Sequence, residues 1–492
     1  MKQAIVIGAG FGGLALAIRL QSGGVQTTLL ERRDKVGGRA YVYEQDGFVF
    51  DAGPTVITDP DCLDELWSLS GRKRQDDVEF MPVDPFYQLC WEDGDRFNYS
   101  GDQESLDRQI AVRRPEDVTG YRKFLAYSED LYREGYEKLG AVPFLKVSQM
   151  LRAAPQLMRL ESHRSVYSKV AQYIGDPRLR EAFSFHSLLV GGNPFETSSI
   201  YALIHALERR GGVWYARGGT GALVSAMARL FQSLGGVLRL SADVDRIEIQ
   251  GDRATAVRLA DGTRLAADMV ASNADVVHTY EHLMRDSRRG PAEARRLKAK
   301  RFSMGLFVIY FGLRGERKDL AHHMVLFGQR YRELIHDIFH GSELPDDFSL
   351  YLHSPSVTDP AMAPPGHSAH YVLSPVPHMG NADIDWEAEG PRYRDRILDY
   401  LDRFYINGLR RDLVTVRHMS PLDFKTELKA HHGSAFSVEP ILTQSAWFRP
   451  HNRDDKIGNL YFAGAGTHPG AGIPGVVSSA KATAGLMLED AS

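Results

Sequence analysis

The chain has 492 residues, of which 43% are hydrophobic and 25% are charged, and its formal net charge is −4. These values are typical of a globular protein of about three domains. They exclude a disordered chain, a disulfide-stapled miniprotein and a strongly basic nucleic-acid-binding protein. The two cysteines, Cys62 and Cys90, are too few for a disulfide framework or a cysteine-rich metal site. We therefore expect a reducing compartment, no resident metal and no nucleic-acid partner.

The N-terminal run from Ala4 to Ile18 is uncharged and has the length of a signal-peptide core. It carries four glycines, which disfavour a helix, and no A-x-A-like cleavage site follows. It is also shorter than the ~20 apolar residues that cross a bilayer, and the run 304–313 is shorter still. We expect neither a signal peptide nor a transmembrane helix, which leaves attachment to a membrane surface as an alternative.

A dinucleotide-binding motif opens the chain. The short apolar segment 4–7 predicts a buried parallel strand, 14–21 predicts a helix, and 25–30 predicts a second strand that ends at Glu31. Between strand and helix lies a G-x-G-x-x-G motif made of Gly8, Gly10, Phe11, Gly12 and Gly13. Such glycines permit a tight turn and close approach to a pyrophosphate, and the acid can accept from a ribose hydroxyl. The alternative is a glycine-rich turn that binds nothing, and the acid alone does not distinguish NAD from FAD.

The residues after Glu31 distinguish between the two dinucleotides. The pattern E-x-x-x-x-x-G-G-R, followed by Gly53 and Pro54, resembles the extended FAD fingerprint of the amine oxidase and carotenoid desaturase superfamily. The resemblance implies FAD as the cofactor. In the same pattern the candidate contacts are Arg32, Gly38 and Arg39, and the Arg39 guanidinium can pair with a phosphate oxygen. The alternative for Arg39 is a surface arginine after a turn.

The C-terminal segment 459–476 contains a second candidate cofactor site. An apolar strand enters a glycine-rich turn, and a helix is predicted from about Gly475, with a proline that suits a helix start. The amino end of a helix can stabilise the negative charge of a reduced flavin. The candidate contacts are Gly464, Gly466, Gly472, Ile473 and Pro474.

This segment and the N-terminal one closely resemble the bacterial-type phytoene desaturases. Further stretches typical of that family lie in order along the chain, at 185–194, 217–221, 272–275, 434–437 and 447–452. Many flavoproteins of the superfamily place an acid directly after the glycine of F-A-G, whereas here Ala465 follows Gly464. That departure agrees with the carotenoid branch and leaves open which group holds the ribityl chain.

The resemblance implies an α/β fold with a discontinuous Rossmann-like FAD-binding domain, an α+β substrate domain and a helical, membrane-facing part. We assign 1–60, 211–275 and 440–492 to the FAD-binding domain, and 61–210 and 276–439 to the substrate domain. Short strands are predicted at 237–240, 244–249, 254–259 and 264–270, separated in part by hairpin turns, and residues 105–210 are predicted to be mostly helical. In this superfamily such strands touch the adenine edge, so Val244 is a candidate backbone contact. The alternative is an ordinary core valine.

The segment 141–170 combines helically spaced apolar residues with a net charge of 5 − 1 = +4, from five Lys and Arg against Glu161. The pattern suits a helix lying on anionic lipid, and equally a buried amphipathic helix with solvated charges. The implied substrate, phytoene, dissolves in bilayers, so we expect peripheral attachment to the inner face of the cell membrane from a cytoplasmic protein. The expected contacts are Phe144, Leu145, Arg152, Leu157 and Arg159.

The implied reaction removes a hydride, which a flavin can accept at N5, and a proton from neighbouring carbons of a hydrocarbon. No acid or base is identified by the sequence. His186 and Asp51 are weak candidates, and a structural role is the alternative for each. The pairs His322–His323 and His431–His432 lack the spacing of a helical metal site, so we expect surface or structural roles. Oxygen or a membrane quinone is the expected final electron acceptor.

The resemblance implies successive desaturations of phytoene to a conjugated carotene, with lycopene as the expected product. An isomerase or an end-group oxidase of carotenoids on the same fold is a second hypothesis. An isoprenoid-binding escort protein without redox activity is a third, which the intact dinucleotide motif disfavours.

Overall fold

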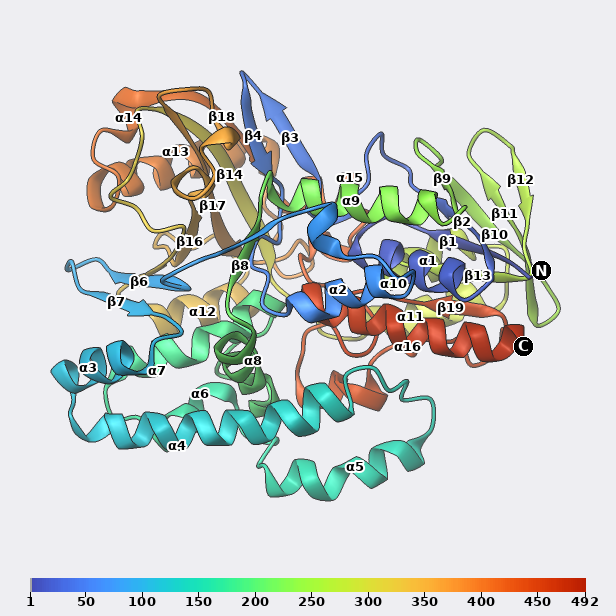
Figure 1. Cartoon of the computed structure of the whole chain (residues 1–492), viewed down its shortest axis with the longest axis horizontal. Coiled ribbons are helices and arrows are strands. Elements are labelled where there is room, and N and C mark those ends of the chain that lie inside the picture. Colours follow the sequence, from blue (N-terminus) through green and yellow to red (C-terminus); the bar gives the residue numbers. More distant parts are fainter. Residues whose placement is uncertain (1) are drawn as a thin grey trace.

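A five-stranded parallel sheet carries the N-terminal motif (Figure 1). The computed structural model describes residues 2–492. The sheet has the order β19-β13-β1-β2-β9, formed by β1 (Gln3–Ile7), β2 (Gln26–Leu30), β9 (Val237–Arg239), β13 (Met269–Ser272) and β19 (Leu460–Phe462). On β1, alternate side chains face opposite sides, with Ala4 and Val6 packing into one hydrophobic cluster and Ile5 and Ile7 into another. The sheet is therefore covered on both faces, as a parallel sheet requires.

Helices cover one face of this sheet. They are α1 (Phe11–Ser22), α2 (Pro60–Ser68), α9 (Gly219–Ser233) and α16 (Ile473–Ala491). The other face is covered by a three-stranded antiparallel sheet and by helices, namely β10 (Val244–Gln250), β11 (Arg253–Leu259), β12 (Arg264–Ala266), α10 (Val276–His278) and α11 (Arg289–Lys298).

The prediction of one strand over 264–270 is wrong. The chain leaves the antiparallel sheet at Ala266 and enters the parallel sheet at Met269. Between them, the Asp268 carboxylate accepts a hydrogen bond from Gln3 N at 2.8 Å. This contact turns the chain from one sheet to the other, and apolar periodicity cannot reveal such a change of partner.

A seven-stranded mixed sheet lies beside the first sheet, with the order β18-β14-β17-β16-β15-β6-β7. Its strands are β6 (Tyr87–Trp91), β7 (Arg96–Tyr99), β14 (Gly305–Arg314), β15 (His323–Phe327), β16 (Leu350–His353), β17 (His367–Val376) and β18 (Leu413–Met419). On β14, Leu306, Val308 and Tyr310 face one core, while Phe307 and Ile309 face the opposite core. The latter packs against α13 (Trp386–Phe404). This sheet therefore has one face free to form a wall of an internal chamber.

The prediction of a mostly helical stretch at 105–210 is confirmed. Its helices are α3 (Gln103–Arg113), α4 (Glu116–Leu131), α5 (Val147–Arg159), α6 (Val166–Val170), α7 (Pro177–Ser184) and α8 (Leu203–Gly211). The remaining elements are β3 (Val42–Gln45), β4 (Phe48–Asp51), β5 (Phe80–Pro82), β8 (Trp214–Ala216), α12 (Tyr331–His340), α14 (Leu409–Asp412) and α15 (Pro421–Glu427). In Figure 1, α5 lies at the periphery of the molecule. Within residues 2–492, every helix is too short or too polar to cross a membrane.

Candidate functional site

A large cavity of about 540 Å³ is bounded by both main sheets. At one end its walls are the residues that follow the carboxyl ends of β1, β2 and β19, where ligands of parallel α/β sheets bind. We call this part the cofactor end. The other part, which we call the chamber, is walled by side chains of β14–β17 and of the 3-10 helix η4 (Phe185–Val190).

Backbone conformation or close packing requires glycine at three positions of the first motif. Gly8 has a φ of +93°, and a Cβ on Gly13 would overlap the Gly8 carbonyl oxygen. A Cβ on Gly12 would lie 2.5 Å from Asn273 Oδ1 and 3.2 Å from Gly464 Cα. The helix α1 begins at Phe11 without a side-chain cap, so its first N–H groups are available to an anion. Gly8, Gly10, Phe11 and Gly12 line the cavity, whereas Gly13 serves the packing of helix on strand.

Glu31 is held rigidly at the cofactor end. The residue is 5% exposed, and its carboxylate accepts hydrogen bonds from Ala9 N at 2.8 Å and from Arg33 N at 3.0 Å. Lone pairs remain for hydroxyl donors of a ribose. Val244 lines the cavity nearby, and so does Arg32, whose guanidinium donates to the Glu427 carbonyl at 2.6 Å.

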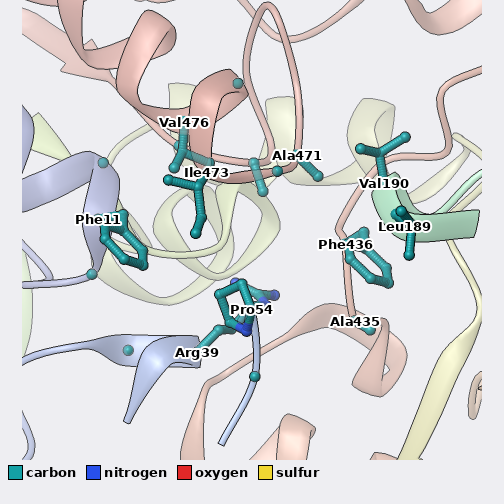
Figure 2. A pocket seen from close by; sticks show the side chains of 18 of the residues that line it. Phe11, Arg39, Pro54, Leu189, Val190, Ala435, Phe436, Ala471, Ile473 and Val476 are labelled. Carbon is teal, nitrogen blue, oxygen red and sulfur yellow. The ribbon is translucent and has the colours of Figure 1, made fainter. Parts of the chain in front are cut away.

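The G-G-R part of the extended fingerprint places the cationic side chain of Arg39 at the cavity. Gly38 has a φ of +57°, and a Cβ there would lie 3.3 Å from Gly10 Cα. Arg39 points into the cavity next to Pro54 (Figure 2). Its Nε is buried and finds no hydrogen-bond partner among residues 2–492. Burial lowers the pKa of the Arg39 guanidinium, and the nearby Asp275 carboxylate partly offsets this.

The C-terminal glycine-rich turn closes the same end. α16 begins at Ile473, two residues before the predicted start, and its cap Gly472 has a φ of +93° and offers no side chain. Ile473, Ala471 and Val476 face the cavity in Figure 2, and Gly464 and Pro474 also line it. Gly466 does not line the cavity. A Cβ on it would lie 2.8 Å from Val276 Cγ1, so Gly466 packs closely against α10, and its contact with the cofactor stays a prediction.

These observations fit FAD. One cavity is faced by two uncapped helix ends, a glycine turn suited to a pyrophosphate, a fixed carboxylate and an arginine whose buried Nε has no partner within residues 2–492. We would place the dinucleotide along Gly10, Glu31 and Arg39, and its ring toward Pro54 and Ile473.

Two polar residues at the cofactor end, Asn273 and Asp275, were not predicted from the sequence as site residues. Asn273 Nδ2 donates to the Gly8 carbonyl at 3.3 Å, and its Oδ1 is the atom that a Cβ on Gly12 or Gly464 would meet. Asp275 caps α10 by accepting from Val277 N at 2.9 Å, and its Oδ2 has no partner within the described part of the chain. Their position directly after an apolar strand was the signal that could have identified them.

The chamber is lined mainly by apolar side chains. Leu189, Val190, Ala435 and Phe436 surround its junction with the cofactor end (Figure 2). Beyond them lie Leu188, Leu203, Ile204, Leu207, Met304, Leu306, Val308, Val325, Phe327, Leu350 and Leu373. A surface of this kind binds an extended hydrocarbon by shape and burial.

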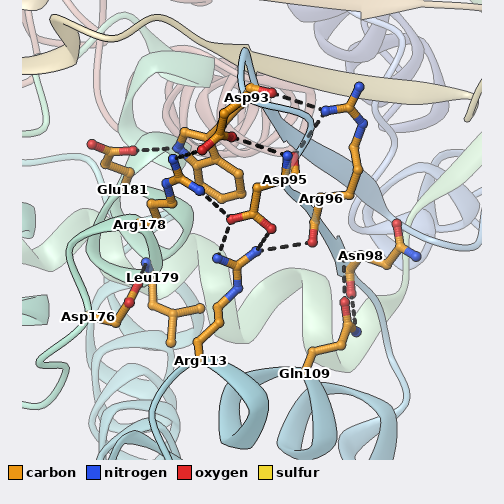
Figure 3. A network of polar contacts seen from close by, with 11 residues as sticks. Asp93, Asp95, Arg96, Asn98, Gln109, Arg113, Asp176, Arg178, Leu179 and Glu181 are labelled. Atoms are coloured by element: carbon orange, nitrogen blue, oxygen red, sulfur yellow. Dashed lines mark hydrogen bonds and ion pairs between the residues drawn. The ribbon is translucent and has the colours of Figure 1, made fainter.

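A polar network anchors one wall of the chamber from outside (Figure 3). Arg113 of α3 makes two hydrogen bonds to Asp95, at 2.5 and 2.6 Å, and Arg178 of α7 reaches Asp95 at 2.7 Å and Asp93 at 2.5 Å. Trp91 Nε1 donates to Glu181 Oε2 of α7 at 2.8 Å. The β6–β7 turn is therefore tied to α7, which leads directly into η4.

The two weak acid–base candidates lie outside the cavity lining. The Asp51 carboxylate accepts from Gly221 N at 3.3 Å, and burial raises its pKa to about 7. His186 is buried, with Nε2 3.0 Å from Glu208 Oε2. Of the histidine pairs, His322 and His323 are buried, so a surface location is wrong for that pair.

The segment expected to contact a membrane divides into two faces. Phe144 is 2% exposed and packs its ring 4.9 Å from that of His468, so its assignment to the membrane surface is wrong. Leu157 lines the cavity. Arg152 and Arg159 are exposed on α5, as are Val147, Leu151 and Met158, whereas Leu145 is half-buried. The helical spacing of apolar residues had predicted a single face in contact with lipid. Such spacing identifies apolar positions but does not show whether they contact a membrane or line a cavity.

Comparisons with known proteins agree with this geometry. The family model described as flavin-containing amine oxidoreductase matches residues 11–488. A phytoene desaturase (lycopene-forming) from Paracoccus sp. is 65% identical over 99% of this chain and 98% of its own length, and one from Pantoea ananas is 62% identical over 100% of both. Among solved structures, cyclohexylamine oxidase from Brevibacterium oxydans matches with a TM-score of 0.65 at 18% identity, covering 100% of this chain and 99% of its own. The chain therefore belongs to the flavin-containing amine oxidoreductase family, and within it to the bacterial phytoene desaturases.

Proposed function

We propose that this protein is an FAD-dependent desaturase that converts phytoene to lycopene by successive dehydrogenations. The observation that carries the proposal is that one cavity joins a dinucleotide site to an apolar chamber. Relatives that are 61–65% identical over nearly the whole chain bear the name phytoene desaturase (lycopene-forming).

FAD, when bound, supplies a two-electron acceptor for hydride. The residues of this chain position the substrate and exclude water. The substrate has no polar group, so its register depends on the shape of the chamber, and the residues at the junction, Val190 and Phe436, orient one C–H bond toward the cofactor end. An apolar, enclosed wall also keeps water from a cationic carbon during the reaction.

Peripheral attachment to the inner face of the cell membrane completes the proposal. α5 contributes Met150 and Leu157 to the cavity lining, while Leu151 and Met158 are 66% and 74% exposed on its outer surface. Phe448, also exposed, belongs to a short helix that contacts α5. With Arg152 and Arg159 beside them, these residues form a basic and apolar surface next to the chamber, which suits anionic lipid. A hydrocarbon dissolved in the bilayer would enter here, and oxygen or a membrane quinone would reoxidise the flavin.

The test is an anaerobic spectrum. Phytoene in liposomes is added to the FAD-loaded protein, and flavin bleaching is recorded together with the polyene bands. Bleaching with rising polyene absorption supports desaturation, and the band positions count the conjugated bonds. A bound but unreduced flavin would instead favour a carotenoid isomerase or another carotenoid substrate, and a folded protein that binds no flavin would favour the escort function.

A further inference from the structure

Desaturation releases a proton as well as a hydride, and the proposed function leaves the destination of that proton open. Several polar side chains line the cavity among the apolar ones, such as Glu208, Tyr331 and Tyr371. Tyr351 of β16 is one of them, because it lines the cavity and is only half-buried. Its hydroxyl group lies in the part of the chamber that is nearest the cofactor end, as the following contacts show.

Tyr351 is linked to the residues beside the cofactor end by hydrogen bonds. Its hydroxyl is 3.2 Å from Thr55 Oγ1, which in turn is 2.7 Å from the hydroxyl of Tyr371. Tyr371 donates to the Gly53 carbonyl at 3.1 Å. Thr55 follows Pro54, which lies beside Arg39 in Figure 2. The Tyr351 hydroxyl therefore lies at the boundary between the two parts of the cavity.

Behind Tyr351 lies a buried pair of imidazoles. The Tyr351 hydroxyl is 2.6 Å from His323 Nδ1, and His323 Nδ1 is 3.3 Å from His353 Nδ1. The antiparallel pairing of β15 and β16 places His323 directly opposite His353. Burial holds the pKa of both histidines well below the usual value, so each imidazole is neutral at pH 7 and a proton that it receives is readily passed on.

The group continues toward the surface. The His322 ring lies 4.4 Å from that of His323 and 4.8 Å from that of His353 between centroids. His322 Nδ1 is 2.6 Å from Thr358 Oγ1, and Thr358 is half-buried beside the exposed Val357. The Nε2 atoms of all three histidines are buried and have no hydrogen-bond partner within residues 2–492. Buried polar atoms without partners are rare and call for a functional explanation.

We propose that Tyr351 accepts the proton released from the substrate and passes its own hydroxyl proton to His323; this proposal rests on the proposed function. One C–H bond of the substrate gives a hydride, with both electrons, to bound FAD. The neighbouring C–H bond breaks, its electron pair becomes the new π bond, and its proton goes to the Tyr351 oxygen as the O–H proton moves to His323 Nδ1. His353, His322 and Thr358 then provide the exit route.

The neutral pair of Tyr351 and His323 is a sufficient acceptor for the proton that the substrate loses. Loss of hydride leaves an allylic cation, and a C–H bond beside such a cation is strongly acidic. The relay moves an existing positive charge from carbon to imidazole, so no additional ion is created in the apolar site. An acceptor at the boundary of the chamber is also close to the carbon that gives up its hydride, because the two carbons are neighbours.

The experiment compares flavin bleaching and polyene formation from phytoene in Tyr351→Phe, His323→Gln and the parent protein, anaerobically and in single turnover. Tyr351→Phe keeps the ring and removes the acceptor. His323→Gln keeps a hydrogen-bond acceptor for Tyr351 but cannot take a proton. Because hydride loss precedes proton loss, the deciding readout is the rise of polyene absorption, which we expect to be about 10²-fold slower or worse in both variants, as is typical for loss of a general base. The FAD content and the amount of phytoene retained should be unchanged.

A matched control is Tyr393→Phe, because Tyr393 is a buried tyrosine outside the cavity whose hydroxyl bonds Ser374 at 2.8 Å. Its rate should match that of the parent. A further readout separates proton transfer from a structural role: in D₂O, the rise of polyene absorption should slow in the parent and not in Tyr351→Phe.

Near-parental rates in both Tyr351→Phe and His323→Gln would overturn the proposal, as would a parent rate that is insensitive to D₂O. If Tyr351→Phe does not fold, His323→Gln decides alone. A parent protein whose flavin phytoene does not reduce would contradict the proposed function itself, and the role of Tyr351 would be lost with it.

Discussion

The two parts of the cavity are built on different principles. The cofactor end is built around backbone segments that approach each other closely. Gly10 and Gly38 approach each other so closely that a Cβ on Gly38 would lie 3.3 Å from Gly10 Cα. The chamber is made of side chains, such as Leu306, Val325 and Leu373, from strands far apart in the chain. A backbone surface tolerates almost no added atom, whereas an apolar side-chain surface tolerates exchange at constant volume.

The largest effect is expected for Gly10→Val. Its Cβ would lie 3.3 Å from Asn273 Nδ2 and 3.6 Å from the Gly37 carbonyl oxygen, so the two methyl groups must occupy the space of the pyrophosphate. We expect the purified protein to contain no FAD, as measured by its absorption spectrum.

The control for this change is Gly458→Val, because a Cβ there meets no atom within 4 Å. It should keep its flavin. Equal FAD content in folded Gly10→Val would contradict the assignment of the cofactor end.

Glu31→Ala should have the next largest effect. The carboxylate is preorganised by Ala9 N and Arg33 N, and its loss should weaken FAD binding by roughly 1.5–3 kcal/mol, the range for hydrogen bonds to a charged group. Titration of the apoprotein with FAD measures the change. Glu44→Ala is the control, because that carboxylate is exposed and pairs with Lys35 at 3.0 Å. Unchanged affinity in Glu31→Ala would remove Glu31 from the site.

A smaller effect, on membrane binding, is expected for charge reversal on α5, which lies beside the chamber. Replacing Arg152 and Arg159 by Glu removes two exposed cations, each worth about 1 kcal/mol near an anionic membrane. Flotation with anionic liposomes should fall, and more steeply at low salt, while FAD content stays constant. The same replacement of Arg229 and Arg295, which are exposed on α9 and α11, is the control. Equal flotation of both pairs would contradict membrane docking through α5.

The smallest effect is expected inside the chamber. Leu373→Met conserves volume and should cost less than about 1.5 kcal/mol of unfolding free energy, with desaturation retained. The informative contrast is Gly12→Ala, which adds a single carbon 2.5 Å from Asn273 Oδ1. Denaturant unfolding and flavin content together compare the two. If Leu373→Met were the more damaging variant, the distinction between backbone and side-chain surfaces would be wrong.

The sequence by itself determined the cofactor end. The glycines, Glu31 and the start of α1 lie within a few tens of residues, and their function depends on local backbone conformation, which residue type controls directly. The same holds for the strand, turn and helix at the C-terminus. There the predicted start missed only the two residues before Gly475.

The tertiary structure alone decided what each apolar side chain faces. Phe144 packs on His468 and Leu157 lines the cavity, although both fit the helical pattern of a membrane surface equally well. The contact of Tyr351 with His323 arises from the pairing of β16 with β15, strands with 22 residues between them. Burial and strand pairing depend on the packing of distant segments, and a local pattern carries no information about which segments will meet.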